Sequence, residues 1–241
     1  MHVIGIDAWR GGWVAVELTG DLVTGAAAGP PRLCSVRLAT TLVEVTETFP
    51  EAAATGVDMP MGLLAQGWRT ADDEAARILG AQRSRVFRVP PRAAITDGSS
   101  GLPYADAVSR CRELTDPPLG FSRQAWGLAA KIREADEIRA VDHGRLFEVH
   151  PELSFATLAG GQPVAASKKT WHGQHERRRL LTGAGIVIPD DLGPAGAAPA
   201  DDILDAAAVA WTAARIARGK AAFLPESEQL DDRGRPIRIW Y

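Results

Sequence analysis

The chain has 241 residues, of which 46% are hydrophobic and 24% are charged, and its net charge is −3. This composition is typical of a globular protein with one large domain, or with one domain that carries a sizeable insertion. The near-neutral charge excludes a global preference for nucleic acid or anionic membrane, so any such surface must be local. Cys34 and Cys111 are far apart in the sequence, which predicts two free thiols in a reducing compartment.

The first seven residues lack the basic region and the long apolar run of a signal peptide. We therefore predict no signal peptide and no membrane span. The expected location is the cytoplasm, and a membrane is not an expected partner.

Residues 3–16 read as a short apolar strand, a glycine-containing turn and a second apolar strand. Both faces of the first strand carry apolar or small residues, which predicts a central place in its sheet. Asp7 stands at the end of this strand, where burying an unpaired carboxylate would be costly. We expect Asp7 to meet a cation, a hydrogen-bond cluster or a solvent-filled cleft, or else to accept amide hydrogen bonds from the turn at residues 8–12.

The next elements complete most of a sheet. Residues 32–38 and 53–58 predict the third and fourth strands, and residues 39–49 predict an amphipathic helix that ends at Pro50. Asp58 is again an acid at a strand end. The order strand, strand, strand, helix, strand predicts an α/β sheet of mixed direction.

Residues 68–141 change in character to helical segments and loops. We interpret them as a helical insertion or cap, between the fourth and fifth strands, within a single domain that spans residues 1–241. The expected helices are residues 71–82, 104–114 and 122–141.

An arginine-rich segment lies inside this insertion. Residues 81–92 contain four arginines and no acid. Arg85 and Arg92 are candidate contacts to substrate phosphates, because a guanidinium binds phosphate through paired hydrogen bonds. A solvated arginine-rich loop is the alternative.

A fifth strand is predicted at residues 146–149, and it continues into Glu148-Val-His-Pro-Glu152. Two acids and a histidine therefore crowd a strand end. His150 could shuttle a proton or orient a carboxylate, and a buried, hydrogen-bonded histidine is the alternative.

A second basic segment follows. Lys168 and Lys169 precede a predicted helix around residues 176–181, and they are candidate substrate contacts, with simple solvent exposure as the alternative. Residues 183–199 predict a loop with a short strand at 186–188, and residues 236–241 predict an edge strand.

The clearest helix begins just after Pro199 and carries Asp201, Asp202 and Asp205 near its start. Acids in a first turn stabilise a helix by about 0.3–1 kcal/mol each, which is the alternative to a functional site. Capping does not explain Asp205, whose apolar neighbours predict that it faces the sheet.

Acids at the ends of separate core elements would repel one another if they converged without a counterion. The candidates are Asp7, Asp58, Glu148, Glu152, Asp202 and Asp205. Mg²⁺ or Mn²⁺ takes carboxylate oxygens, and two such ions roughly 3.5–4 Å apart can stabilise both the attacking and the leaving oxygen in phosphoryl transfer. The chemistry predicted is hydrolysis of phosphodiester bonds by a metal-activated water.

The same residues carry a resemblance to a known family. The matching segments are Gly5-Ile-Asp7 with Gly12-Trp-Val14, Val57-Asp-Met-Pro-Met-Gly-Leu63, Glu148-Val-His-Pro-Glu152, Ser167-Lys-Lys-Thr170 and Asp201-Asp-Ile-Leu-Asp-Ala206, with Gln124 to Glu134 in support. In this combination the chain resembles the predicted ribonuclease H-like nuclease family, also called domain of unknown function 429. The resemblance spans essentially the whole chain.

The resemblance implies a ribonuclease H-like fold, a mixed sheet flanked by helices, whose acids bind metal. In that fold one acid lies on the first strand, one near the end of the fourth strand and one on a late helix. The matching positions are Asp7, Asp58 and either Asp205 or Asp202, with Glu148 or Glu152 as a candidate fourth. The implied activity is that of a hydrolase acting on a nucleic acid, either DNA or RNA.

Two other functions stay open. A phosphotransferase of the sugar-kinase and actin type shares the fold and uses an acid and glycines on its first hairpin, although that class normally needs the core twice. A non-catalytic binding protein on the same fold is the other. Among the tryptophans, Trp9 and Trp171 are candidates for stacking on bases, whereas Trp13, Trp126 and Trp211 are expected to pack in the interior.

Overall fold

The computed structural model describes residues 2–20, 29–96, 102–142 and 144–241. The chain divides into two compact units. The first unit comprises residues 1–59, 142–222 and 240–241, and the second comprises residues 60–141 and 223–239. The segment interpreted as an insertion, residues 68–141, belongs to the second unit, and its role as a cap within a single domain stays a prediction.

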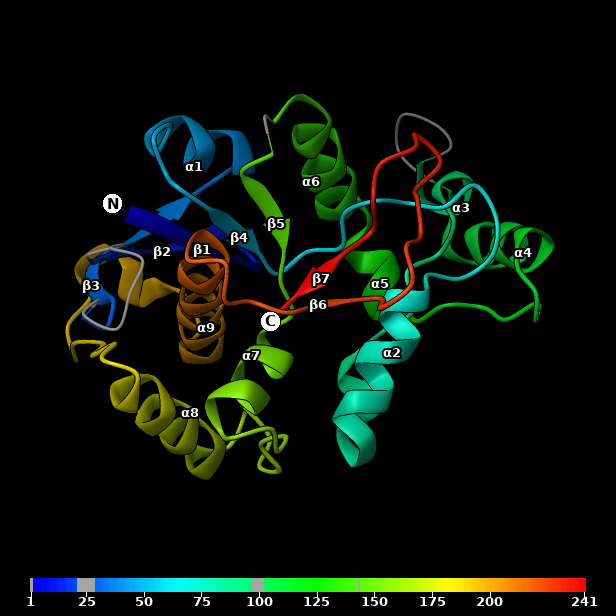
Figure 1. The fold of residues 1–241 in the computed structure, drawn as a ribbon. Coiled ribbons are helices and arrows are strands. Elements are labelled where there is room, and N and C mark those ends of the chain that lie inside the picture. The colour runs from blue at the N-terminus through cyan, green and yellow to red at the C-terminus, as the bar shows by residue number, and fades with distance from the viewer. Residues whose placement is uncertain (1, 21–28, 97–101, 143) are drawn as a thin grey trace. The chain divides into compact units, whose positions relative to one another are not determined.

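A five-stranded sheet forms the centre of the first unit (Figure 1). Across the sheet the strands are β3 (Arg32–Ala39), β2 (Gly12–Thr19), β1 (His2–Trp9), β4 (Thr55–Val57) and β5 (Leu146–Glu148). Strands β1, β2 and β3 pair antiparallel, while β4 runs parallel to β1 and β5 runs parallel to β4. This arrangement confirms the predicted ribonuclease H-like mixed sheet, with β1 at its centre.

Helices of the first unit surround this sheet. They are α1 (Leu42–Thr48), α7 (Pro151–Leu158), α8 (Trp171–Gly183) and α9 (Ala200–Ala217), with a short 3₁₀ helix η2 (Gly193–Ala197). Helix α7 was not predicted, although Pro151 occupies its first turn, a position that proline favours.

Helix α9 approaches the central strand unusually closely, because both surfaces are small. Ala206 and Ala210 of the helix are fully buried. Gly5 of β1 lies directly against them, and an added Cβ there would stand 2.0 Å from the Ala210 nitrogen and 2.2 Å from the Ala206 carbonyl oxygen. Only glycine at this strand position leaves room for the helix backbone.

The face of the sheet that α9 covers also carries Asp7 and Asp58. Gly5 pairs with Gly56 in the parallel register, and an added Cβ at Gly56 would meet a side chain of α9 at 2.8 Å. Because side chains alternate along a strand, the residues two positions further on, Asp7 and Asp58, point to the same side. The Asp58 nitrogen donates to the Ile6 carbonyl oxygen at 2.8 Å. This hydrogen bond places Asp58 beside Asp7 at the same end of the two strands.

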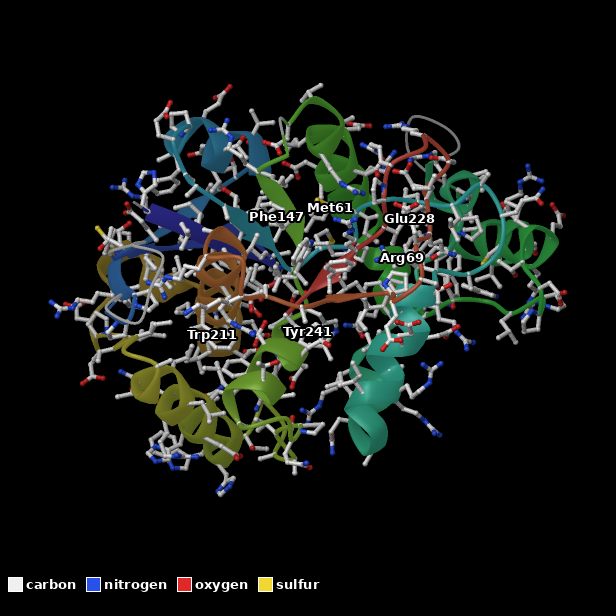
Figure 2. The ribbon with its side chains drawn as sticks, in the orientation of Figure 1. Met61, Arg69, Phe147, Trp211, Glu228 and Tyr241 are labelled. Carbon is white, nitrogen blue, oxygen red and sulfur yellow. The ribbon has the colours of Figure 1, made fainter. Side chains whose placement is uncertain are left out.

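The hydrophobic core of the first unit fills the space between this face and helices α7, α8 and α9. Phe147 of β5, labelled in Figure 2, packs at its border. The ring of Phe147 meets that of Trp240 edge to face, with centroids 5.6 Å apart. Ile186 and Ile188 are buried in the core, yet residues 186–188 form no strand. The strand predicted there is wrong, because the alternation reflects burial of an extended loop without a partner strand.

The second unit is mainly helical. Its elements are α2 (Thr70–Leu79), the 3₁₀ helix η1 (Gly80–Arg85), α3 (Arg92–Thr96), α4 (Tyr104–Leu114), α5 (Arg123–Gly127), α6 (Ala129–Val141) and β6 (Phe223–Leu224), which pairs with β7 (Ile239–Trp240). The single helix expected at residues 122–141 is two helices that meet at Leu128. The predicted edge strand at residues 236–241 is confined to β7.

Buried charge pairs organise the second unit. Asp136 is fully buried and accepts hydrogen bonds from Arg92 Nη1 at 2.8 Å, Arg235 Nη2 at 3.0 Å and the Gly62 nitrogen at 3.0 Å. Arg69, next to α2 in Figure 2, is 1% exposed. These side chains are held by partners within their own unit, which is how charges survive burial.

Two further expectations concern thiols and membranes. Cys34 is exposed, Cys111 is buried, and both are free, as predicted. Among the described residues, no helix combines the length and the apolar character needed to cross a membrane.

Candidate metal centre

Three carboxylates from separate elements of the first unit meet at one point. Asp7 comes from β1, Asp58 follows β4, and Asp205 comes from the second turn of α9. One carboxylate oxygen of each lies within 4.8 Å of the others. Asp7 is 5% exposed, Asp205 is fully buried and Asp58 is half-buried. Three acids this close, and this far from solvent, repel one another unless protons or a cation intervene.

The individual oxygens of the group differ in their partners. Asp7 Oδ1 accepts a hydrogen bond of 2.6 Å from the Ala8 nitrogen, so the turn contact expected from the sequence is present alongside the convergence. Asp205 Oδ1 is buried and has no hydrogen-bond partner among the described residues. An ionised carboxylate oxygen left in this state is costly, which indicates a ligand position for a cation.

Lys168 places a positive charge beside the group. Its Nζ donates a hydrogen bond to Asp205 Oδ2 and lies 4.0 Å from Asp201 Oδ2. The neighbouring Lys169 Nζ lies 2.5 Å from Asp201 Oδ2. The two lysines predicted as substrate contacts therefore bind acids of α9 in this structure.

Burial and mutual repulsion raise the pKa values of the three acids. Burial raises the pKa of Asp7 well above its usual range, and Asp58 and Asp205 raise it further. Burial, followed by the charge of Asp205, raises the pKa of Asp58 to about 8. Burial also raises the pKa of Asp205, against the opposing effect of Lys168. Without metal, the centre therefore retains protons at neutral pH.

The pKa of Lys168 shifts in the opposite direction to that of an isolated buried amine. Burial alone would lower the pKa of Lys168, but the charges of Asp205, Asp7 and Asp58 outweigh that effect and raise it. The amine therefore stays charged, and one positive charge faces three carboxyl groups. Carboxylate oxygens in excess of the local positive charge are the ligand set that Mg²⁺ and Mn²⁺ prefer, so these residues fit such an ion.

The family model described as "Protein of unknown function (DUF429)" matches residues 5–230 of the chain. The chain belongs to this family. A comparison with curated proteins found no match. Among solved structures, the Thermus thermophilus RuvC structure is similar, with 15% sequence identity and a TM-score of 0.40 over 91% of this chain and 98% of that chain.

In this DUF429 chain, Asp202 lies at the edge of the centre. It precedes Asp205 by one helical turn and is half-buried. Burial, and next the charge of Asp201, raises the pKa of Asp202 to about 6. Asp202 is not among the three acids whose oxygens meet, so its role as a ligand stays a prediction.

Glu148, at the end of β5, lies near the three acids without being one of them. It pairs with Val57 of the neighbouring strand β4. Its charge helps to raise the pKa of Asp58, after the larger effects of burial and of Asp205. The group of three does not include it, nor does it include His150, which lies at the start of α7.

Glu152 is held by a buried arginine of α8. Arg177 of α8 is fully buried, and its Nη2 donates to both Oε1 and Oε2 of Glu152 at 2.8 Å. Its Nη1 donates to the Ala166 carbonyl oxygen at 3.0 Å and thereby holds the segment that leads to Lys168. The pairing spans 25 residues and has no local sequence signal, so it could not have been predicted.

The arginines predicted as phosphate contacts belong to the second unit. Arg92 donates to Asp136 and also to Asp232, with Nε to Oδ2 at 2.6 Å and Nη2 to Oδ1 at 2.8 Å. Arg85 is half-buried at the end of η1. Contact of either residue with a substrate stays a prediction.

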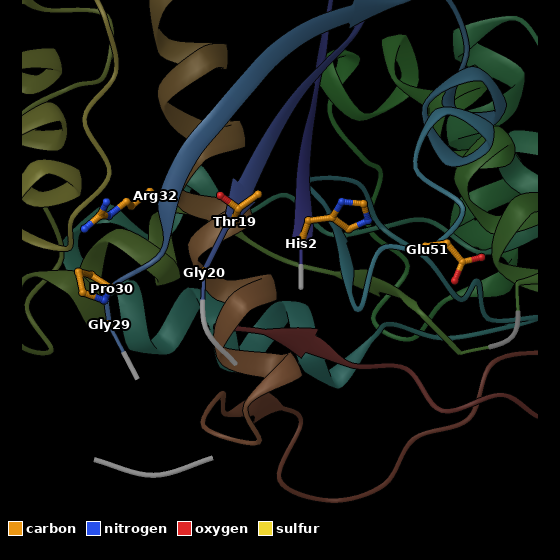
Figure 3. Close-up of a pocket in the computed structure, with 7 residues that line it drawn as sticks. All are labelled: His2, Thr19, Gly20, Gly29, Pro30, Arg32 and Glu51. Atoms are coloured by element: carbon orange, nitrogen blue, oxygen red, sulfur yellow. The ribbon is translucent and has the colours of Figure 1, made fainter. Parts of the chain in front are cut away.

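A cavity of about 690 Å³ lies at the far end of β1 from Asp7. His2, Thr19, Arg32 and Glu51 are among the residues that line it (Figure 3). Among the described residues that line it, only Glu51 has a carboxylate, so these residues do not form a ligand set comparable to the three acids.

Proposed function

We propose that this protein is a metal-dependent nuclease that hydrolyses phosphodiester bonds of a nucleic acid. The observation that carries the proposal is the convergence of Asp7, Asp58 and Asp205 from three elements of a ribonuclease H-like sheet. A buried group of acids with a partnerless oxygen is a poor way to stabilise a fold, and it is a suitable way to hold Mg²⁺ or Mn²⁺.

In the proposed mechanism Asp7, Asp58 and Asp205 hold the cation, and Asp202 is the additional acid available to a second ion. A bound divalent ion would supply an activated water and would offset charge on the phosphate. The backbones of β1, β4 and α9 hold the three carboxylates in place before the substrate binds, so the site needs little reorganisation during the reaction.

Lys168 has two roles in this proposal. In the absence of metal its ammonium group offsets part of the charge on Asp205. When a cation takes over that task, the amine is available to a phosphate oxygen of the substrate, as a lysine commonly is. Lys169, which is 68% exposed, lies on the solvent side and is a further candidate for a phosphate contact.

The structure gives no specific support to the phosphotransferase alternative. That class normally needs the core twice, and the described residues contain one five-stranded sheet and a two-stranded one. The non-catalytic alternative predicts no metal affinity, so metal binding separates it from the nuclease.

The test is a cleavage assay with labelled single-stranded and duplex DNA and RNA oligonucleotides in Mg²⁺ or Mn²⁺. We expect the wild type to cleave at least one substrate, EDTA to abolish cleavage, and Asp205→Asn to lower the rate at least about 100-fold, since metal charge stabilisation is worth several kcal/mol. Glu47→Gln, which removes an exposed carboxylate of α1, is the matched control and should cleave normally. An Asp205→Asn variant as active as the control would contradict the proposal.

A further inference from the structure

A second cavity of the first unit, about 280 Å³ in volume, lies between α8 and the start of α9. Its residues include Trp171, Gln174, His175, Arg178, Ile203 and Leu204. The volume is close to the lower end of the roughly 300–1,000 Å³ found for small-molecule sites, so it suits one ring system better than a large ligand.

Trp171 at the rim of this cavity has an exposure that interior packing does not explain. Its side chain is 85% exposed. Its ring lies nearly parallel to that of His175, with centroids 6.4 Å apart and an interplanar angle of 18°. A large, exposed and pre-oriented aromatic face is costly in water and is typical of a stacking platform for a base.

The interior of the cavity combines an apolar wall with polar groups. Ile203 and Leu204 of α9 are buried and form part of the wall. The half-buried side chain of Gln174 contributes an amide to the lining. An amide offers both a donor and an acceptor, which is the requirement for reading the edge of a base.

The cavity and the three acids share helix α9. Leu204, in the cavity wall, is adjacent in sequence to Asp205, and the two side chains leave the helix about 100° apart, on adjoining faces. On the other side, Lys168 and Lys169 bind acids of α9, and Trp171 follows two residues later at the start of α8. Two lysines that bind acids of α9 therefore immediately precede the aromatic platform in the chain, so phosphate-binding and base-stacking groups are neighbours in sequence.

We propose that this cavity binds one unpaired nucleobase of the substrate strand, with Trp171 stacking on its face. The inference rests on the proposed nuclease function and narrows its substrate to nucleic acid with an accessible, unpaired base near the scissile phosphate. A base held in a duplex could not enter, because its faces are covered by neighbouring bases.

The chain positions Trp171 firmly enough for this role. Thr170 caps α8 through a hydrogen bond from the Gly173 nitrogen to its Oγ1 at 3.1 Å. Gly173 in turn lies against the preceding segment, since an added Cβ would stand 2.1 Å from the Ser167 carbonyl oxygen. These contacts fix the backbone of Trp171 relative to the segment that carries Lys168.

The test measures binding of a labelled twelve-residue oligothymidylate by fluorescence anisotropy, in Ca²⁺ and again in EDTA, with an oligouridylate as the RNA counterpart. Trp171→Ala should weaken binding about 5- to 150-fold, which is the value of stacking on one base. Trp171→Phe should recover part of the loss. Val187→Ala, which truncates an exposed side chain outside the cavity, is the control and should bind as the wild type does.

A twelve-residue abasic oligonucleotide separates base recognition from phosphate contacts. The wild type and Trp171→Ala should bind it equally, and the wild type should prefer the single strand to the matching duplex. Equal loss of affinity for the abasic strand, or no effect of Trp171→Ala on any strand, would overturn the inference while leaving cleavage by the acids intact.

Two other results would also overturn it. If Trp171→Ala changed the molecular mass in light scattering, the platform would be a contact to a second copy of the chain. If the wild type bound Mn²⁺ but neither single strand nor duplex, the nucleic-acid substrate itself, and with it the proposed function, would fail.

Discussion

Asp58 shows how one carboxyl group responds to burial and to its neighbours. Its pKa of about 8 lies far above the usual value of 3.8, first because of burial and next because of Asp205. In the metal-free protein this group is protonated at neutral pH, whereas in the unfolded chain it is ionised. The folded state therefore binds more protons than the unfolded state throughout the interval between these two pKa values.

Stability of the metal-free protein should therefore decrease with pH. As the pH rises from about 4 to about 8, its free energy of unfolding should fall, on the order of a few kcal/mol. Asp58→Asn should reduce this slope and should raise the stability at pH 8, because the amide does not ionise. Urea unfolding in EDTA at pH 5 and pH 8 measures both effects.

The matched control for this experiment is Glu47→Gln, which neutralises an exposed carboxylate of α1. It should retain the wild-type slope. If Asp58→Asn were less stable than the wild type at pH 8, Asp58 would be a structural hydrogen-bond acceptor and not a member of a repelling group.

Lys168 provides the second prediction at this scale. Lys168→Met leaves Asp205 without its ammonium partner, so the metal-free variant should lose roughly 1–3 kcal/mol of stability. Mn²⁺ should restore most of the loss, because the cation replaces the missing charge. Thermal unfolding with and without Mn²⁺ gives the comparison.

Lys169→Met is the comparison, because Lys169 is 68% exposed and its partner Asp201 is not one of the three acids. Its loss should cost less than that of Lys168, since water screens the charge of Lys169 more strongly. If both variants behaved alike in EDTA, the ammonium group of Lys168 would have no special relation to the three acids.

At the scale of elements, the contact between β1 and α9 positions two of the three acids. Gly5→Ala would force a methyl group to within 2.0 Å of the Ala210 nitrogen, which is helix backbone and cannot rotate away. We expect a loss of at least about 3 kcal/mol and a displaced Asp205. The free energy of unfolding, measured with a chemical denaturant, and the affinity for Mn²⁺ should both decrease.

Gly183→Ala is the control for the Gly5 substitution. Gly183 ends α8, and an added Cβ there meets no atom within 4 Å. Its stability should stay within about 1 kcal/mol of the wild type. A Gly5→Ala variant as stable as this control would show that α9 can move off the strand without cost.

The elements also show where sequence reasoning succeeds and where it fails. The hairpin of β1 and β2 and the long helix α9 were predictable, because their apolar patterns are long and their turns or starts are marked by glycine or proline. The strand expected at residues 186–188 was wrong, since burial alternates there without backbone pairing. Helix α7 was missed because it is short and nearly uniform in burial, so it shows no periodicity.

At the scale of the whole molecule, each unit has its own network of buried charge. Asp136 in the second unit faces Arg92, Arg233 and Arg235. Asp136→Asn removes the buried anion that these guanidinium groups share, although Arg92 keeps Asp232 and Arg235 keeps Asp231. It should destabilise the second unit by roughly 1–3 kcal/mol, the value of hydrogen bonds to a charged group. Hydrogen exchange should show the loss of protection within residues 60–141.

Asp73→Asn serves as its control, because Asp73 pairs with Arg88 where both side chains are over 40% exposed. That substitution should cost less than about 1 kcal/mol. Equal effects of the two substitutions on exchange would show that the Asp136 network does not stabilise the unit.

The candidate centre was only partly predictable from the sequence. Asp7 and Asp58 could be found because each ends a recognisable strand, and Asp205 because it lies on the buried face of α9. The sequence could not separate them from Glu152, whose partner Arg177 lies 25 residues away. Such pairings depend on how helices pack, which local patterns do not encode.

The three acids form a metal site in the proposed enzyme, and calorimetric titration of the metal-free protein with Mn²⁺ tests this most directly. It requires no knowledge of the substrate. We predict saturable binding by the wild type and by Glu47→Gln, and binding at least tenfold weaker in Asp58→Asn. Absence of wild-type binding even with an added oligonucleotide, or undiminished binding by Asp58→Asn, would show that the three acids are not a metal site.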